Sequence, residues 1–158
     1  MGISNNALTS VPDIRDFLFG GQAEFTLHSI PTGKHFTYRI INHSSNPEHS
    51  IRFVFFLGGS DNDSDWVYAG TLKRFFTHKD GETKYTGQLK FNHTARSPDP
   101  GSAVMQAFGW MIHMLNKNTV AADQMEFMHT GRCSACGRKL TTPESIRTGM
   151  GPVCRSKL

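Results

Sequence analysis

The sequence predicts an α+β fold, with a mostly antiparallel β-sheet, one long helix packed on it, and a small module that holds all the cysteines. Three observations lead to this prediction. Apolar and polar residues alternate in short runs between residues 23 and 92, as they do in half-buried strands. The apolar spacing then changes to that of one helical face over residues 104–115. Finally, the three cysteines all lie after residue 130.

The sheet is expected to follow a flexible start, residues 1–12, and a short helical turn. Asp13 stands near the beginning of that turn, and Gly20-Gly21 ends it. Strands are expected over residues 23–29, 35–42, 51–57, 66–76 and 84–92. Pro31-Thr32-Gly33 makes the first two strands a hairpin, and residues 77–83 are expected to form the loop between the last two.

The long helix is predicted from a stripe of large apolar residues. Val104, Phe108, Met111 and Leu115 fall on one helical face, and polar residues 116–118 end the pattern. A last strand, 124–128, is expected to lead into the cysteine module. The chain therefore divides into a start (1–12), an α+β domain (13–128) and a C-terminal module (129–158).

Composition narrows the classes of protein. The chain has 158 residues, enough for one domain with a small appendage, and it holds no apolar run of membrane-spanning length. The first twelve residues lack the basic and apolar regions of a signal peptide, so we expect a protein of a reducing cytoplasm that contacts no membrane. In a reducing compartment, an odd number of cysteines favours metal ligation over disulfides.

The cysteine spacing is typical of a structural zinc site. Cys133 and Cys136 form a C-x-x-C pair, and Cys154 follows after 17 residues. Tetrahedral zinc needs a fourth ligand, and His129, four residues before Cys133, is the best candidate. The expected cofactor is therefore one structural Zn²⁺ ion.

The residues around the cysteines fit a zinc knuckle of the treble-clef or zinc-ribbon kind. Gly137 allows a tight turn after the pair. Thr141 and Glu144 have the spacing of a capping box, with Pro143 in the first turn of a short helix that ends near Gly149. With Glu144 explained as a cap and no H-x-E motif present, no general base accompanies the metal, and a structural role is favoured over a catalytic one.

The positive charge of the chain is concentrated in this module. Residues 129–158 hold six basic residues against one carboxylate, a net charge of +5 compared with +4 for the whole chain. Such a basic patch favours polyanionic partners, above all nucleic acid. The candidate phosphate contacts are Arg132, Arg138, Lys139, Arg147, Arg155 and Lys157.

The module also resembles a known group of proteins. The run CSACGRKLTTPESIRTGMGPVC (133–154) is similar to the C-terminal zinc motif of many small, largely uncharacterised proteins of bacteriophages and prophages. Three earlier runs look like the N-terminal part of that family, namely DFLFGGQAEFTL (16–27), TGKHFTYR (32–39) and DWVYAGTL (65–72). The resemblance implies a phage-encoded protein that acts in a bacterial cytoplasm, and it implies no particular activity.

Two further constellations have simpler interpretations. The acidic run 61–65 imitates the start of a calcium loop, but Trp66 and Leu72 stand where Gly and Glu are required, so an acidic turn is the better interpretation. Six aromatic residues are either core or a base-stacking platform on an open sheet face, with core favoured. These residues are Phe36, Tyr38, Phe53, Phe55, Trp66 and Tyr68.

The sequence therefore favours a non-enzymatic zinc protein that binds nucleic acid through its basic C-terminal module. One alternative is a phage inhibitor that binds a host or defence protein through the helix or the aromatic sheet, with a purely structural zinc. The other is a metal-dependent nuclease, for which no motif is present. The oligomeric state is left open.

Overall fold

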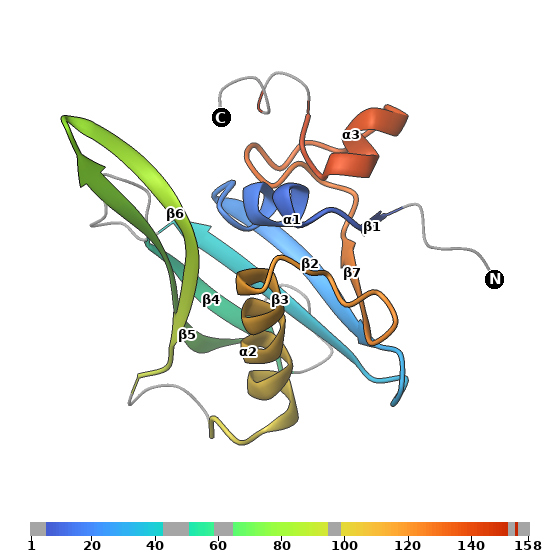
Figure 1. Ribbon diagram of the computed structural model, residues 1–158. Coiled ribbons are helices and arrows are strands. Elements are labelled where there is room, and N and C mark those ends of the chain that lie inside the picture. Colours follow the sequence, from blue (N-terminus) through green and yellow to red (C-terminus); the bar gives the residue numbers. More distant parts are fainter. Residues whose placement is uncertain (1–5, 43–50, 59–64, 95–98, 152–153, 155–158) are drawn as a thin grey trace.

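The structure is a computed structural model, which describes residues 6–42, 51–58, 65–94, 99–151 and 154. These residues fold as one antiparallel sheet with three helices (Figure 1). The elements are β1 (Ala7–Leu8), α1 (Val11–Leu18), β2 (Gln22–Ser29), β3 (His35–Asn42), β4 (Ile51–Leu57), β5 (Trp66–Lys79), β6 (Glu82–Asn92), α2 (Ala103–Asn116), β7 (Met125–His129) and α3 (Pro143–Thr148).

The strand order of the seven-stranded sheet is β1-β7-β2-β3-β4-β5-β6, and each neighbouring pair is antiparallel. Strands β2 to β6 follow the chain, while β7 lies between β1 and β2. The last strand of the chain therefore pairs with two of the first, and it brings the C-terminal segment to the start of β2. The sheet curves like a half-barrel around α2 (Figure 1).

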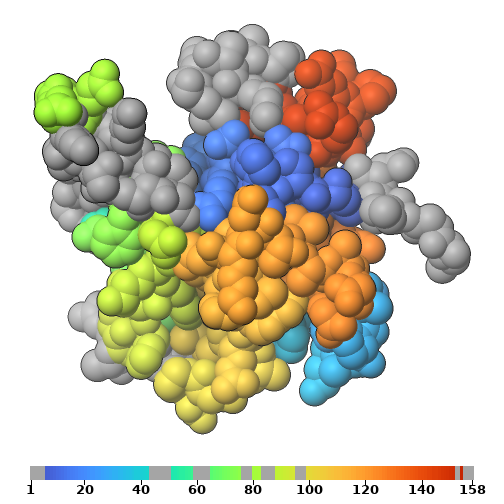
Figure 2. Space-filling view, in the orientation of Figure 1, coloured from blue at the N-terminus to red at the C-terminus, as the bar shows by residue number. Residues whose placement is uncertain are grey.

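The core lies on the concave face of the sheet, which α2 covers, and α1 lies next to the end of α2 (Figures 1 and 2). Phe25 of β2 stacks between Phe127 and Tyr38, with ring centroids 4.4 Å and 5.4 Å away. Phe108 of α2 lies over Tyr38, and the Tyr38 hydroxyl donates a hydrogen bond to the Val104 carbonyl oxygen at 2.7 Å. The aromatic rings of three strands thus hold α2 in place.

The predicted fold class is wrong in its main feature. The protein is mostly antiparallel sheet, and the helices of the described residues have only 8, 14 and 6 residues, so none of them is a long packed helix. The helical spacing over residues 104–115 does correspond to a helix, α2, which spans residues 103–116 and ends before Asn118, whose φ of 60° leaves the helical region. A cysteine cluster near the C-terminus stands in place of the expected treble-clef or zinc-ribbon module.

The long hairpin β5–β6 also differs from the prediction. The sequence predicts a loop over residues 77–83, but the strands continue to a two-residue turn at Asp80-Gly81. Both turn residues have positive φ, 54° and 77°, which suits the tight turns that match the twist of a hairpin. Most of the acidic run 61–65 lies outside the described residues.

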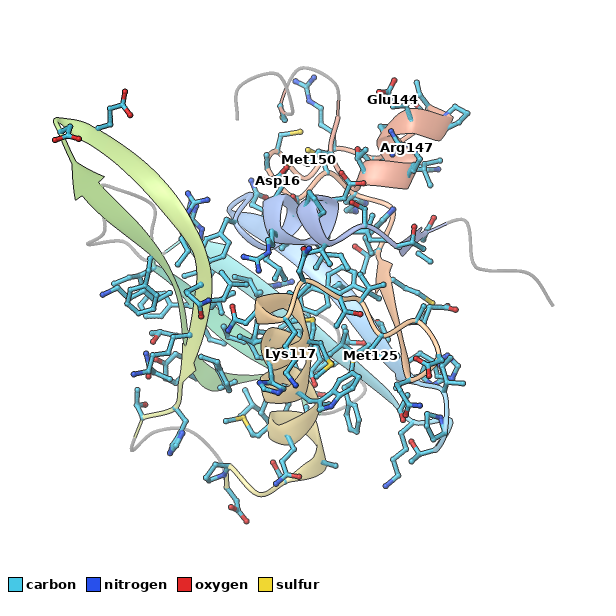
Figure 3. The ribbon with its side chains drawn as sticks, in the orientation of Figure 1. Asp16, Lys117, Met125, Glu144, Arg147 and Met150 are labelled. Carbon is cyan, nitrogen blue, oxygen red and sulfur yellow. The ribbon has the colours of Figure 1, made fainter. Side chains whose placement is uncertain are left out.

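Among the residues that the structure describes, no helix is long and apolar enough to cross a membrane. A second, smaller hydrophobic cluster lies beside the main core and is formed by Cys133, Leu140 and Met150. Figure 3 shows Met150 next to α1, where this cluster meets the rest of the protein.

Candidate metal centre

The three cysteines of the chain come together after β7. Their sulfur atoms all lie within 4.8 Å of one another. Cys133 is buried, Cys154 is partly buried and Cys136 is exposed, so the cluster lies at the surface with one side against the protein. Cys133 and Cys136 belong to one turn, and Cys154 comes from the segment after α3.

The turn between the first two cysteines is fixed by backbone hydrogen bonds. The Gly137 N–H donates to the Cys133 carbonyl oxygen at 2.9 Å, and the Cys133 N–H donates to the Arg138 carbonyl oxygen at 2.9 Å. Gly137 has a φ of 78°, a conformation that glycine adopts without strain. A β-bridge between Arg132 and Lys139 closes the base of the turn. The sequence prediction of a tight turn at Gly137 is confirmed.

Helix α3 returns the chain toward the turn. Its capping box is formed by Thr142 and Ser145, whose side chain and backbone groups bond reciprocally, and not by the predicted pair of Thr141 and Glu144. The helix ends at Gly149 in the left-handed conformation, with a φ of 76°. The Gly149 carbonyl oxygen then accepts a hydrogen bond from the Ser134 N–H at 3.0 Å, which ties the end of α3 to the cysteine turn.

The module is packed against the beginning of the sheet. The Ser134 carbonyl oxygen accepts a hydrogen bond from the Gln22 N–H at 2.6 Å, at the first residue of β2. Gly149 lies so close to Phe17 that a β-carbon there would be 2.4 Å from the ring. Arg147 of α3 approaches Asp13 of α1 at 3.7 Å. Both α1 and β2 therefore position the cysteine turn.

The local electrostatics favour a thiolate at the first cysteine. Burial raises the pKa of the Cys133 thiol, but backbone N–H groups of Gly151, Cys136 and Ala135 stabilise the thiolate more strongly, and the pKa falls to about 7. The Ala135 N–H lies 3.4 Å from the Cys133 sulfur. Burial, together with hydrogen bonding to and charge repulsion from the sulfur atoms of Cys133 and Cys136, raises the pKa of Cys154 to about 11. A bound cation would remove that repulsion.

These donors fit a thiophilic transition metal. Three sulfur atoms from a C-x-x-C turn and a returning segment are the ligand type and spacing of structural zinc sites. A zinc ion would be held by Cys133, Cys136 and Cys154, and it would supply the crosslink that joins the turn to the segment after α3. Among the described residues, no carboxylate or histidine nitrogen belongs to the same cluster.

The structure does not bring His129 to the cysteines. His129 ends β7 and is 3% exposed. Its Nδ1 accepts a hydrogen bond from the Gly131 N–H at 2.9 Å, so the ring hydrogen is on Nε2, which donates to the Ile146 carbonyl oxygen. Burial lowers the pKa of His129, and the bond to Ile146 offsets part of this effect. Both ring nitrogens are thus engaged by backbone groups, and the role of His129 as fourth ligand stays a prediction.

The six predicted phosphate contacts are placed as follows. Arg132, Arg138 and Lys139 are exposed around the cysteine turn, where the Arg132 guanidinium also donates to the Gly137 carbonyl oxygen at 3.1 Å. Arg147 is an exposed residue of α3 and pairs with Asp13 of α1 (Figure 3). Arg155 and Lys157 lie outside the described residues.

The six aromatic residues that could form a platform divide between the two faces of the sheet. Tyr38 is buried under α2, and Phe36 packs against the same core. Phe53, Phe55, Trp66 and Tyr68 project from the opposite face and are only partly buried. The sequence could not make this division, because it depends on which face of β3 and β4 receives the helices.

A protein family matches the C-terminal part of the chain. This family, described as being of unknown function (DUF6011), matches residues 123–158, which comprise β7 and the cysteine module. Neither the curated proteins nor the solved structures gave a match.

Proposed function

We propose that residues 129–158 form a structural zinc module whose basic surface binds the phosphate backbone of nucleic acid. The observation that carries the proposal is the position of the cysteine turn. The turn and the segment after α3 bring three sulfur atoms within metal-binding distance of one another. Arg132, Arg138 and Lys139 are exposed around this turn. The metal would hold the turn in shape, and the basic side chains would contact the partner.

A structural role for the metal follows from the small size of the local core. The second hydrophobic cluster has three buried residues, Cys133, Leu140 and Met150, one of which is itself a candidate ligand. So small a core stabilises a module weakly, and zinc modules of this size derive their folding free energy largely from the metal. No carboxylate or histidine of the described residues joins the three sulfur atoms, and a set of thiolate ligands is typical of structural zinc sites.

Nucleic-acid binding is supported by charge and exposure. Arg138 and Lys139 are exposed and directly follow the turn, and the only carboxylate of the module, Glu144, lies on α3. Phosphate contacts of this kind position a protein on nucleic acid without reading its sequence. Binding should therefore weaken steeply with salt, as counterions compete for the phosphates.

The phage origin and the bacterial cytoplasm belong to the same proposal. They rest on the likeness of residues 133–154 to the zinc motif of phage and prophage proteins. A phage product that binds nucleic acid would act inside the host cell, where thiolate ligands remain reduced.

The test is a fluorescence anisotropy titration of the zinc-loaded protein with duplex DNA at two salt concentrations. The double variant Arg138→Glu and Lys139→Glu should bind at least about tenfold more weakly, and its dependence on salt should be shallower by about two phosphate contacts. A matched control reverses two exposed lysines elsewhere, Lys34→Glu and Lys117→Glu, with the same change in net charge. If both double variants lose affinity equally, the loss comes from net charge and not from Arg138 and Lys139 in particular. If Arg138→Glu with Lys139→Glu binds DNA as the parent does, the proposal is refuted.

A further inference from the structure

The face of the sheet opposite to the helices carries a patch of aromatic residues, and we infer that this patch binds the bases of single-stranded nucleic acid. The outer aromatic patch consists of Phe53 and Phe55 of β4 and Trp66 and Tyr68 of β5. The inference rests on the proposed function, since it adds base contacts to the phosphate contacts of the cysteine module.

The patch lies on a sheet face that α1 and α2 do not cover. In β4, the alternate residue Val54 is fully buried on the concave side, whereas its neighbours Phe53 and Phe55 are only partly buried. In β5, Ala69 is 1% exposed beside the partly buried Tyr68, whereas Val67 on the other side of Tyr68 is 38% exposed. An apolar sheet face of this kind is normally covered in a globular protein, so four partly exposed rings on it indicate a binding surface.

The rings of the patch stand beside one another across two strands. Tyr68 pairs with Phe55 in the register of β4 and β5, and their ring centroids are 5.7 Å apart at 68°. Phe53 lies 6.0 Å from Tyr68 on its other side, at 71°. The rings are therefore held edge to face at fixed spacing. Bases can stack on such rings regardless of sequence, because every base has a flat apolar surface.

Cations accompany the rings, which favours a polyanion as the partner. The Arg39 guanidinium lies 4.4 Å from the centre of the Trp66 ring. On the same face, the Lys73 ammonium lies 5.1 Å from the Phe75 ring, and Lys73 pairs with the exposed Lys90 of β6. Aromatic rings with interleaved cations are the combination by which single-stranded nucleic acid is bound, with stacking for the bases and positive charge for the phosphates.

A groove connects the patch to the basic module. It has a volume of about 360 Å³, and its lining includes Arg39 and Ile41 of β3, Glu24 of β2, and Arg132 and Gly137 of the cysteine turn. Arg39 therefore lines the groove and also lies over Trp66 of the patch. From β7 to β5 the sheet is four strand spacings wide, roughly 19 Å, a span that suits a few extended nucleotides. Glu24 is the one carboxylate among the described residues that line the groove, and it is paired across the strands with Arg39.

The test uses the fluorescence of Trp66. The chain has two tryptophans, so Trp110→Phe leaves Trp66 as the only source of tryptophan fluorescence. Three probes are titrated, namely an oligo-dT and an oligo-U of about 15 nucleotides and an oligomer of the same length that has sugars and phosphates without bases. Stacking on the patch should quench the fluorescence of Trp66 when oligo-dT or oligo-U is added, and the base-free oligomer should leave this fluorescence unchanged. The reciprocal variant Trp66→Phe, which keeps Trp110 on α2, should show no quenching.

The affinities supply the second measurement. Phe55→Ala and Tyr68→Ala should each weaken oligo-dT binding roughly tenfold, the usual effect of removing one stacked ring, while duplex binding by the basic module persists. Ile30→Ala, which removes a side chain that is 45% exposed away from the patch, is the matched control. Circular dichroism melting of each variant verifies that the sheet is intact.

The outcomes separate the two proposals. If oligo-dT binds without quenching Trp66, and if Phe55→Ala and Tyr68→Ala bind it as the parent does, the inference is refuted and the patch is left to a protein partner. If Arg138→Glu with Lys139→Glu still binds the base-free oligomer normally while oligo-dT quenches Trp66, the proposed role of the module fails and the patch stands. Preference for oligo-U or oligo-dT identifies RNA or DNA as the natural strand.

Discussion

The imidazole of His129 donates its Nε2 hydrogen to the carbonyl oxygen of Ile146, and this bond joins the last strand of the sheet to the C-terminal helix. The other nitrogen of the ring is occupied by the Gly131 N–H. His129 therefore holds both ends of the chain segment that contains the cysteine turn. Its position four residues before a C-x-x-C pair predicts a metal ligand, and in the structure both of its ring nitrogens contact backbone groups.

Replacing His129 by alanine should destabilise the fold and leave the metal in place. The change removes a buried donor and leaves the Ile146 carbonyl oxygen unpaired, which should lower the free energy of unfolding by about 1–3 kcal/mol. Urea unfolding gives the stability, and elemental analysis of the purified variant gives the metal content. His113→Ala, at an exposed site on α2, serves as the control. Loss of the metal in His129→Ala alone would establish His129 as the fourth ligand after all.

The pKa of His129 predicts a loss of stability in mild acid. Burial depresses this pKa below its ordinary value of 6.5, so the unfolded chain takes up a proton before the folded chain does. The stabilising contribution is therefore complete above about pH 6.5 and declines as the pH falls below that value. Urea midpoints measured on both sides of this pH should differ more in the parent than in His129→Gln. Equal pH dependence in the two proteins would mean that His129 is not the titrating group.

Removing one cysteine should release the metal without unfolding the sheet. In Cys136→Ser, two sulfur ligands remain, and we expect the metal content to fall from one ion per chain to near zero. The module should become sensitive to protease, while the far-ultraviolet circular dichroism of the strands persists, because the main core contains none of the cysteines. Ala135→Ser introduces a hydroxyl into the same turn and keeps all ligands, so it should retain the metal. Unchanged metal content in Cys136→Ser would show that Cys136 is not a metal ligand and would refute the assignment of the site.

Gly149 tests how tightly the module is packed on α1. Alanine there would require a left-handed backbone and would bring a β-carbon to 2.4 Å from Phe17, so we expect a loss of about 2–4 kcal/mol in stability. Gly33 has a similar φ of 72°, and a β-carbon there would meet no atom within 4 Å, so Gly33→Ala should cost only about 1 kcal/mol. Thermal melts of the two variants separate these contributions, because Gly149→Ala introduces both the clash and the backbone strain, and Gly33→Ala introduces the strain alone. Equal losses would show that Phe17 moves aside freely.

Local patterns predicted the individual strands well and the arrangement of the sheet poorly. The alternation in residues 35–42 coincides with β3, and the β-branched and aromatic run over residues 51–57 coincides with β4, although only alternate residues of β4 are buried. The two residues of β1 are too few for any periodic signal, and the insertion of β7 between β1 and β2 pairs residues that are 96 to 121 positions apart in the chain. Such pairings leave no trace in a local pattern.

The site shows the same division between local and distant information. Cysteine spacing identified the cluster, since it follows from the covalent chain. The predicted capping box lies one residue too early, although the position of Pro143 indicates the correct cap. Proline suits the first helical position, so the residue before it, Thr142, is the cap. The partners of His129 are backbone groups, which any sequence would supply, and they could not be inferred.

The position of β7 has a consequence for the order in which the protein can form during synthesis. Strands β2 to β6 follow one another in the sequence and can pair as they leave the ribosome. One edge of β2 and all of β1 can pair only after residues 125–129 of β7 have been synthesised. Until then, the nascent chain presents an unpaired strand edge next to an incomplete core, a condition that promotes association between chains. Translation rate and chaperones should accordingly affect the yield of this protein more than they affect proteins whose strands pair in sequence.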